Sequence, residues 1–225
     1  MDNKQKVKIL KDGPYVISGS IPLSKEEFVL GGDGEPVSYK ITFTYPLKSN
    51  YSLCRCGKSA NFPFCDATHV KIKYDGTETA ARKSFMEMAE KTVGPEIDLY
   101  DAKCFCSIAR FCIPAGDTWT LTENSNDPAS KKLAIEEACN CPSGRLVAWD
   151  KKINKPIEPG FEPAISLLED TKHNVRGPFW LKGGISLESS DGYQYEVRNR
   201  VNICGCGRSI NKPFCNGAHL HDHRK

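Results

Sequence analysis

The segment CRCGKSANFPFCDATH, at residues 54–69, recurs later in the chain as CGCGRSINKPFCNGAH, at residues 204–219. Both copies share the pattern C-x-C-x2-S-x3-P-F-C-x3-H. Each copy gathers three thiols and one imidazole within 16 residues, and these are side chains that bind metals. The repeat therefore predicts two metal-binding units of similar structure.

The rest of the composition describes a polar globular protein of 225 residues, with 39% hydrophobic and 26% charged residues. Basic and acidic residues are interspersed and the net charge is only +3, so we expect no nucleic-acid partner. The N-terminal residues lack a signal-peptide pattern and no apolar run has membrane-spanning length, so we expect no membrane contact. The expected location is cytoplasmic, where an odd set of eleven cysteines favours metal ligation over disulfides.

The repeat extends upstream of the metal loops, because Gly13–Leu23 parallels Gly177–Leu187. That pair is offset by 164 residues and the metal loops by 150, so the first copy carries 14 extra residues. The polar, glycine-rich stretch Ser24–Gly34 is the natural place for them. In both copies a β-rich run follows, at Ser38–Phe43 and Tyr193–Val197, and a strand then leads into the first cysteine. A duplicated unit that buries little alone is expected to pack against its twin.

A different segment separates the two copies. Thr77–Val93 has a helical pattern in which Phe85 and Met88 are expected to be core residues. Asp127 is a predicted N-cap for a helix over Pro128–Ala138. We predict a short strand at Arg145–Trp149. The predicted division is a first unit at 7–75, a connecting helix at 76–94, a ferredoxin-like domain at 95–150, a linker at 151–164 and a second unit at 165–225.

In each metal loop the histidine follows the third cysteine by four residues, which places both on one helical face. Asp66 and Asn216, directly after that cysteine, are residue types that favour a helix N-cap. Spacing alone leaves zinc and an iron–sulfur cluster both possible, because a zinc ion held by three cysteines and one histidine is a common structural site.

The full sequence pattern decides between these two cofactors, because Ser59, Pro63 and Phe64 recur with the ligands as Ser209, Pro213 and Phe214. The two segments resemble the CDGSH-type iron–sulfur family, the mitoNEET-like proteins, whose members hold a 2Fe-2S cluster with three cysteines and one histidine. Ala67 replaces the glycine of the family motif in the first copy, and Asn216 and Ala218 replace its aspartate and serine in the second. The resemblance implies the ligands Cys54, Cys56, Cys65 and His69 for one cluster, and Cys204, Cys206, Cys215 and His219 for the other.

Five further cysteines lie in the centre of the chain. Cys141 precedes a proline, as the last ligand of a ferredoxin does, and Cys106 and Cys112 match the outer ligands of a C-x2-C-x2-C triple whose middle residue is Ala109. This segment resembles the divergent single-cluster ferredoxin domain that accompanies CDGSH loops in some proteins. The resemblance implies Cys106, Cys112 and Cys141 as ligands, and the missing fourth thiolate favours a 3Fe-4S cluster. A 4Fe-4S cluster would need Cys104, Cys139 or an outside ligand, and a zinc site made from four of the five thiols is the alternative.

The expected fold class is α+β, with two small β-rich units that each end in a metal-binding loop and a short helix. The units are expected to form an intramolecular pseudo-dimer with a ferredoxin-like insert between them, in a monomeric protein. The expected function is one-electron transfer to an unidentified redox protein. The alternatives are an iron–sulfur cluster carrier that serves an apo-acceptor, a redox or pH sensor, and a zinc-stabilised interaction module. No catalytic motif is present, so we do not expect an enzyme.

Overall fold

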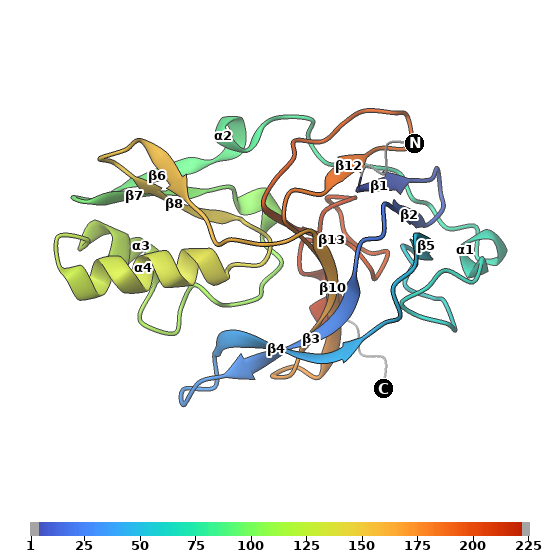
Figure 1. The fold of residues 1–225 in the computed structure, drawn as a ribbon, viewed down its shortest axis with the longest axis horizontal. Coiled ribbons are helices and arrows are strands. Elements are labelled where there is room, and N and C mark those ends of the chain that lie inside the picture. The colour runs from blue at the N-terminus through green and yellow to red at the C-terminus, as the bar shows by residue number, and fades with distance from the viewer. Residues whose placement is uncertain (1–4, 222–225) are drawn as a thin grey trace.

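Three β-sheets and a few short helices make up the computed structural model, which describes residues 5–221 (Figure 1). The fold is mixed α+β, as predicted, and strands predominate. Within residues 5–221 every helix falls short of the length and apolar character that a membrane span requires. The first sheet contains β1 (Lys6–Ile9), β2 (Tyr15–Ser18), β5 (Asn50–Leu53) and β12 (Ser186–Glu188), and the second contains β3 (Leu23–Leu30), β4 (Pro36–Thr44), β10 (Ala164–Asp170), β11 (Val175–Lys182) and β13 (Arg200–Ile203). The third contains β6 (Glu90–Val93), β7 (Ile97–Asp101), β8 (Leu146–Asp150) and β9 (Lys155–Ile157). The helices are α1 (Thr68–Lys71), α2 (Phe85–Met88), α3 (Thr118–Glu123) and α4 (Pro128–Asn140), with 3-10 turns η1 (Lys103–Phe105) and η2 (Ala218–His221).

The first two sheets have corresponding strand orders, and each includes strands from the other half of the chain: the first takes β12, and the second takes β3 and β4. The first runs β12-β1-β2-β5, and the second runs β13-β11-β10-β3-β4. Strand β12 lies parallel to β1 with Val7 opposite Leu187, and β3 lies parallel to β10 with Ile165 opposite Leu23. The two metal-binding units therefore share backbone hydrogen bonds at two places far apart in sequence.

One hydrophobic core joins these two sheets. Strand β1 alternates lysines with fully buried Val7 and Ile9, as a strand with one buried face does. Tyr15 and Ile17 continue the same core from β2, and Phe179 belongs to it from β11. Burying each such side chain contributes about 1.5–3 kcal/mol relative to exposure, so neither unit keeps its core if the other is removed.

The extra length of the first copy forms the long β3–β4 hairpin. This hairpin extends the second sheet and reaches the central domain (Figure 1). Its Tyr39 ring stacks on Phe111 of the central domain with ring centres 4.5 Å apart. The Tyr39 hydroxyl donates a hydrogen bond to the carbonyl of Asn140 at 2.5 Å. The predicted insertion thus holds the central domain against the second unit.

The third sheet and helices α3 and α4 form the central domain (Figure 1). The predicted helix is confirmed as α4, and the Asp127 side chain accepts a hydrogen bond from the backbone N–H of Ser130. The strand predicted at Arg145–Trp149 is confirmed as β8, shifted by one residue. Leu99, Ala138 and Leu146 pack between helix and sheet.

The helix predicted over Thr77–Val93 is wrong. Only the single turn α2 forms, followed by strand β6. Contacts with the second unit compete with the helical pattern, since the backbone N–H groups of Thr79 and Ala80 both donate to the carbonyl of Lys212 at 2.8 and 2.9 Å. Phe85 and Met88 nevertheless contribute to the core, as predicted.

Two smaller expectations also fail. The β-rich run expected at Tyr193–Val197 is irregular and holds only an isolated bridge between Gln194 and Glu188. The predicted linker at 151–164 contains strand β9, which pairs with β8.

Candidate metal centres

Each metal loop is closed by the residues that recur with its ligands. The backbone N–H of Cys54 donates to the carbonyl of Pro63 at 2.8 Å, and Cys204 donates to Pro213 at the same distance. The Ser59 hydroxyl donates to the carbonyl of Phe64 at 2.6 Å, as Ser209 does to Phe214. The serine and proline of the shared pattern therefore fold the loop, and the cysteines and histidine remain free to bind metal.

The four predicted ligands of each loop lie as two pairs. In the first loop the sulfurs of Cys54 and Cys56 are 3.7 Å apart, and the Cys65 sulfur is 3.4 Å from Nδ1 of His69. In the second loop the corresponding distances are 3.7 and 3.5 Å. In the described part of the chain, no three Cys, His, Asp or Glu side chains converge as the ligands of a single ion do.

The residue after the third cysteine does not serve as the predicted helix N-cap. The N-cap of α1 is Ala67, which is left-handed with φ of 66°. Asp66 instead braces the loop, because its carboxylate accepts hydrogen bonds from the backbone N–H groups of Ala60 and Thr68. These bonds lower the pKa of Asp66 below its usual range. In the second loop Asn216 accepts one such bond, from Ala218.

The two sites differ in their exposure. Cys65 and His69 are partly exposed, whereas Cys215 is 2% and His219 is 5% exposed. The central domain covers the second site, since the Ser107 hydroxyl accepts a buried hydrogen bond from the Asn202 amide at 2.9 Å. Burial also lowers the pKa of His219 to about 4.

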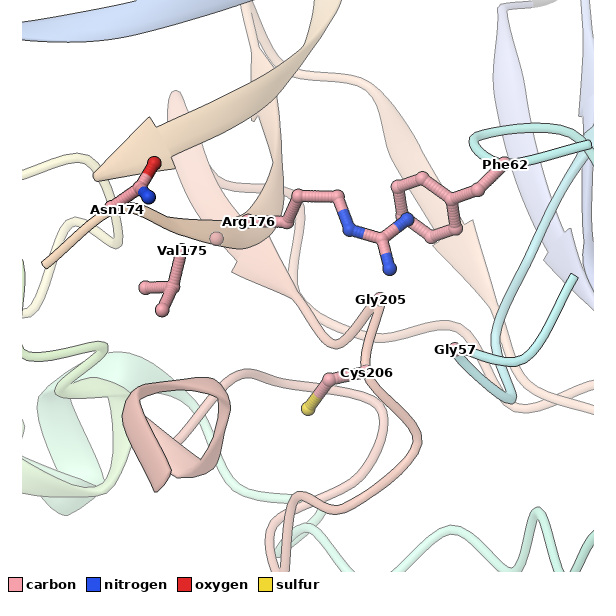
Figure 2. A pocket seen from close by; sticks show the side chains of 8 residues that line it. Gly57, Phe62, Asn174, Val175, Arg176, Gly205 and Cys206 are labelled. Atoms are coloured by element: carbon pink, nitrogen blue, oxygen red, sulfur yellow. The ribbon is translucent and has the colours of Figure 1, made fainter. Parts of the chain in front are cut away.

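The two loops touch each other reciprocally. A Cβ added to Gly57 would lie 2.5 Å from the Cys206 carbonyl oxygen, and one added to Gly207 would lie 2.6 Å from that of Cys56. A cavity of about 130 Å³ lies at this junction, and Figure 2 shows the residues that line it. The Cys206 sulfur and the Arg176 side chain lie beside it, and the guanidinium is 4.3 Å from the centre of the Phe62 ring.

The three predicted central ligands line a single cavity. Cys106, Cys112 and Cys141 surround it together with Ala109. Burial raises the pKa of Cys112 to about 12, and the nearby Cys141 and Cys106 thiols add to the effect. An Arg145 N–H donates to the Cys106 sulfur at 3.1 Å, so a positive charge also faces this site.

The other two central cysteines lie elsewhere. The Cys104 sulfur is exposed and 3.9 Å from the sulfur of Met88. The Cys139 thiol donates to the carbonyl of Ile157 at 3.7 Å. Neither lines the cavity that the other three cysteines share, so the structure does not bring these two additional candidates into the site.

Comparison with known families agrees with this arrangement. Residues 12–70 and 176–220 match the family described as "Iron-binding zinc finger CDGSH type". The chain is a CDGSH-type iron–sulfur protein. Its two CDGSH regions flank residues 92–151, which match the family described as "Divergent 4Fe-4S mono-cluster". No curated protein and no solved structure matches the chain.

The donor sets of this CDGSH protein fit iron–sulfur clusters. Each CDGSH region offers three thiols and one imidazole, and the mono-cluster region offers three thiols around one cavity. Two arginines that the sequence analysis did not single out lie at these sites. Arg145 is held by two hydrogen bonds to Asp101, at 2.6 and 2.7 Å, while it donates to Cys106. Arg55 is buried beside Cys54 and Cys56, and its Nε and Nη1 have no hydrogen-bond partner. The sequence offered one signal for each arginine: Arg55 lies next to a candidate ligand, and Arg145 lies four residues after one.

Proposed function

We propose that this CDGSH protein transfers single electrons and carries two 2Fe-2S clusters and one 3Fe-4S cluster. The paired ligands support the 2Fe-2S assignment. A binuclear cluster needs two ligands at each iron, and Cys54 with Cys56 and Cys65 with His69 are such pairs. A single zinc ion would draw all four ligands around one point. When bound, the clusters supply one-electron redox chemistry, and the histidine ligand raises the potential above that of an all-cysteine site.

The central site favours a 3Fe-4S cluster over the 4Fe-4S alternative. Ala109 lines the cavity together with the three cysteines, at the sequence position where the ferredoxin pattern has the middle ligand of its triple. Cys104 and Cys139 make their contacts outside that cavity. The family description names a 4Fe-4S cluster, whereas in this chain the middle position of the ferredoxin triple C-x2-C-x2-C is Ala109.

The single observation that carries the proposal is that the three sites adjoin in series. The mono-cluster region contacts the second CDGSH region through Ser107 and Asn202. The second region contacts the first through Gly57 and Gly207. The exchanged strands β3 and β12 support the intramolecular pseudo-dimer that brings the two CDGSH loops together. Electron transfer between a buried and an exposed cluster requires that neighbouring sites adjoin in this way.

The partner of this relay is a redox protein that docks at the first CDGSH region. His69 is partly exposed there, and the next residues of the chain, Val70 and Ile72, are 67% and 47% exposed. The second CDGSH region lies against the mono-cluster region instead, so electrons would enter or leave by the first.

The same exposure favours a second candidate function, which is delivery of a cluster to an apo-acceptor protein. A partly exposed histidine ligand can be exchanged more easily than the buried His219. Transfer of a cluster from the holoprotein to an apo-ferredoxin, abolished in the His69→Cys variant and retained in His219→Cys, would favour delivery over electron transfer.

The test begins with iron, zinc and acid-labile sulfide per chain in anaerobically purified protein. About seven irons and about eight sulfides are expected for two 2Fe-2S clusters and one 3Fe-4S cluster. Stepwise reduction followed by electron paramagnetic resonance should then give three one-electron centres. Stoichiometric zinc without sulfide would refute the proposal and leave an interaction module.

A further inference from the structure

Arg55 is a buried positive charge that forms no ion pair with a carboxylate in the described part of the chain. Its residue is 2% exposed, and it has no ion pair with any carboxylate among the described residues. Nη2 donates to the carbonyl of Gly76, while Nε and Nη1 are buried without a hydrogen-bond partner. Burying a charge in this way costs several kcal/mol unless an opposite charge lies nearby.

Two tyrosines lie against Arg55, and one of them connects it to the second loop. The guanidinium carbon lies 5.9 Å from the centre of the Tyr15 ring and 5.6 Å from that of Tyr74. The Tyr15 hydroxyl donates to the backbone carbonyl of Cys204, a ligand of the second loop, at 2.9 Å. Arg55 itself lies between Cys54 and Cys56, two ligands of the first loop. Arg55 is therefore connected to ligands of both loops. The Asp75 carboxylate also feels its charge, since Arg55 adds to the hydrogen bonds from Thr77 that lower the pKa of Asp75, but Asp75 lies beyond ion-pair distance.

The residue that faces the Arg55 guanidinium is a glycine, Gly76, which leaves room for it. A Cβ on Gly76 would collide with Nη2 of Arg55. The second loop has glycine, Gly205, at the equivalent position, and a Cβ added there would make a tight contact of 3.0 Å with the ring of Phe179. Phe179 corresponds to Tyr15 in the repeat. The pair of loops thus contains one such guanidinium and not two.

We propose that Arg55 is the shared counter-ion of the two CDGSH clusters, a positive charge left unpaired for the thiolate-bound clusters to balance. This inference rests on the proposed function, since it assumes iron–sulfur clusters at both loops. A nearby positive charge favours the more negative, reduced state of a cluster. Arg55 therefore raises the reduction potentials of both CDGSH clusters, and it stabilises the loaded form of the protein over the empty form.

The test compares reduction potentials of three holoproteins with the wild type. Arg55→Gln removes the charge and keeps an amide that can donate to the Gly76 carbonyl, and Arg55→Lys keeps the charge. Arg176→Gln is the matched control, because Arg176 lies beside Cys206 but is exposed. The measurement is a potentiometric titration of both 2Fe-2S signals by electron paramagnetic resonance.

We expect Arg55→Gln to shift both reduction equilibria about tenfold toward the oxidised cluster, which is about 59 mV for one electron. Arg55→Lys should recover most of this shift, and Arg176→Gln should give less than half of it. Loss of iron from Arg55→Gln but not from Arg55→Lys would support the same charge requirement. Unchanged potentials in Arg55→Gln, an equal shift in Arg176→Gln, or equal iron loss from both Arg55 variants would overturn the inference. Failure of the proposed function is distinguishable, since the wild type would then lack iron and sulfide.

Discussion

Replacing Gly57 with alanine should damage both CDGSH sites at once. Gly57 has φ of +71°, and an L-residue with a side chain pays about 1 kcal/mol or more in this conformation. The added Cβ would also lie 2.5 Å from the Cys206 carbonyl oxygen, well inside an ordinary contact distance. Forcing a well-packed site apart in this way costs about 1–3 kcal/mol. The sum predicts that Gly57→Ala lowers the free energy of unfolding by about 2–4 kcal/mol.

Gly34 supplies the matched control. Its φ of +76° is almost the same as that of Gly57, but a Cβ there would have no atom within 4 Å. Gly34→Ala should therefore show only the backbone cost, about 1 kcal/mol. The difference between the two variants isolates the contact between the loops.

Denaturant unfolding of the holoproteins, followed by visible absorption and circular dichroism, measures both effects. Gly207→Ala should resemble Gly57→Ala, because its Cβ would lie 2.6 Å from the Cys56 carbonyl oxygen. Each variant is expected to lose iron from the opposite loop as well as its own. If Gly57→Ala is no less stable than Gly34→Ala, the loops do not touch as described and the serial arrangement of the sites fails with them.

Three further predictions follow from single contacts. Ala109→Cys should add the fourth thiolate at the central cavity, so the iron content rises by about one per chain and the 3Fe-4S signal is replaced by that of a 4Fe-4S cluster. Ala67→Gly should raise the free energy of unfolding by about 1 kcal/mol in denaturant melts, because Ala67 is left-handed with φ of 66°. Burial raises the pKa of Asp170, but the hydrogen bonds and charge of Arg110 outweigh it and the net pKa is lowered. The ionised carboxylate therefore stabilises the fold above its ordinary pKa of about 3.9, so Asp170→Asn should cost about 2 kcal/mol at pH 7, and the gap from wild type should close as unfolding is measured at falling pH.

The sequence was sufficient where structure depends on neighbouring residues. The C-x-C spacing, the recurring Ser59 and the strand before Cys54 are local features, and the loop forms as its pattern indicates. The Asp127 cap and first-turn proline also located α4. In each case the contacts that stabilise the element lie within a few residues of it.

Pairings between distant segments could not be predicted. The parallel contact of β1 with β12 joins residues about 180 positions apart, and no local pattern encodes it. The helical pattern of Thr77–Val93 was overridden because the Glu78 carboxylate accepts hydrogen bonds from Ser190 and Tyr195 of the second unit. The helix propensity of a single residue contributes less free energy than one such hydrogen bond. The burial of Arg55 could not be predicted from the sequence either, because the residues that cover it are distant in the chain.

The two loops are alike in chemistry and unlike in surroundings, and one insertion accounts for much of the difference. The 14 extra residues of the first copy lengthen the β3–β4 hairpin, whose Tyr39 and Glu35 hold Phe111 and Arg110 of the central domain. Arg110 also pairs with Asp170 of the second unit at 3.0 Å. The hairpin of one unit thus holds the central domain against the other, which buries the second loop and leaves Cys65 and His69 of the first loop partly exposed. An exact duplicate would expose both histidines equally, so divergence in this hairpin converts two equivalent sites into an inner and an outer one.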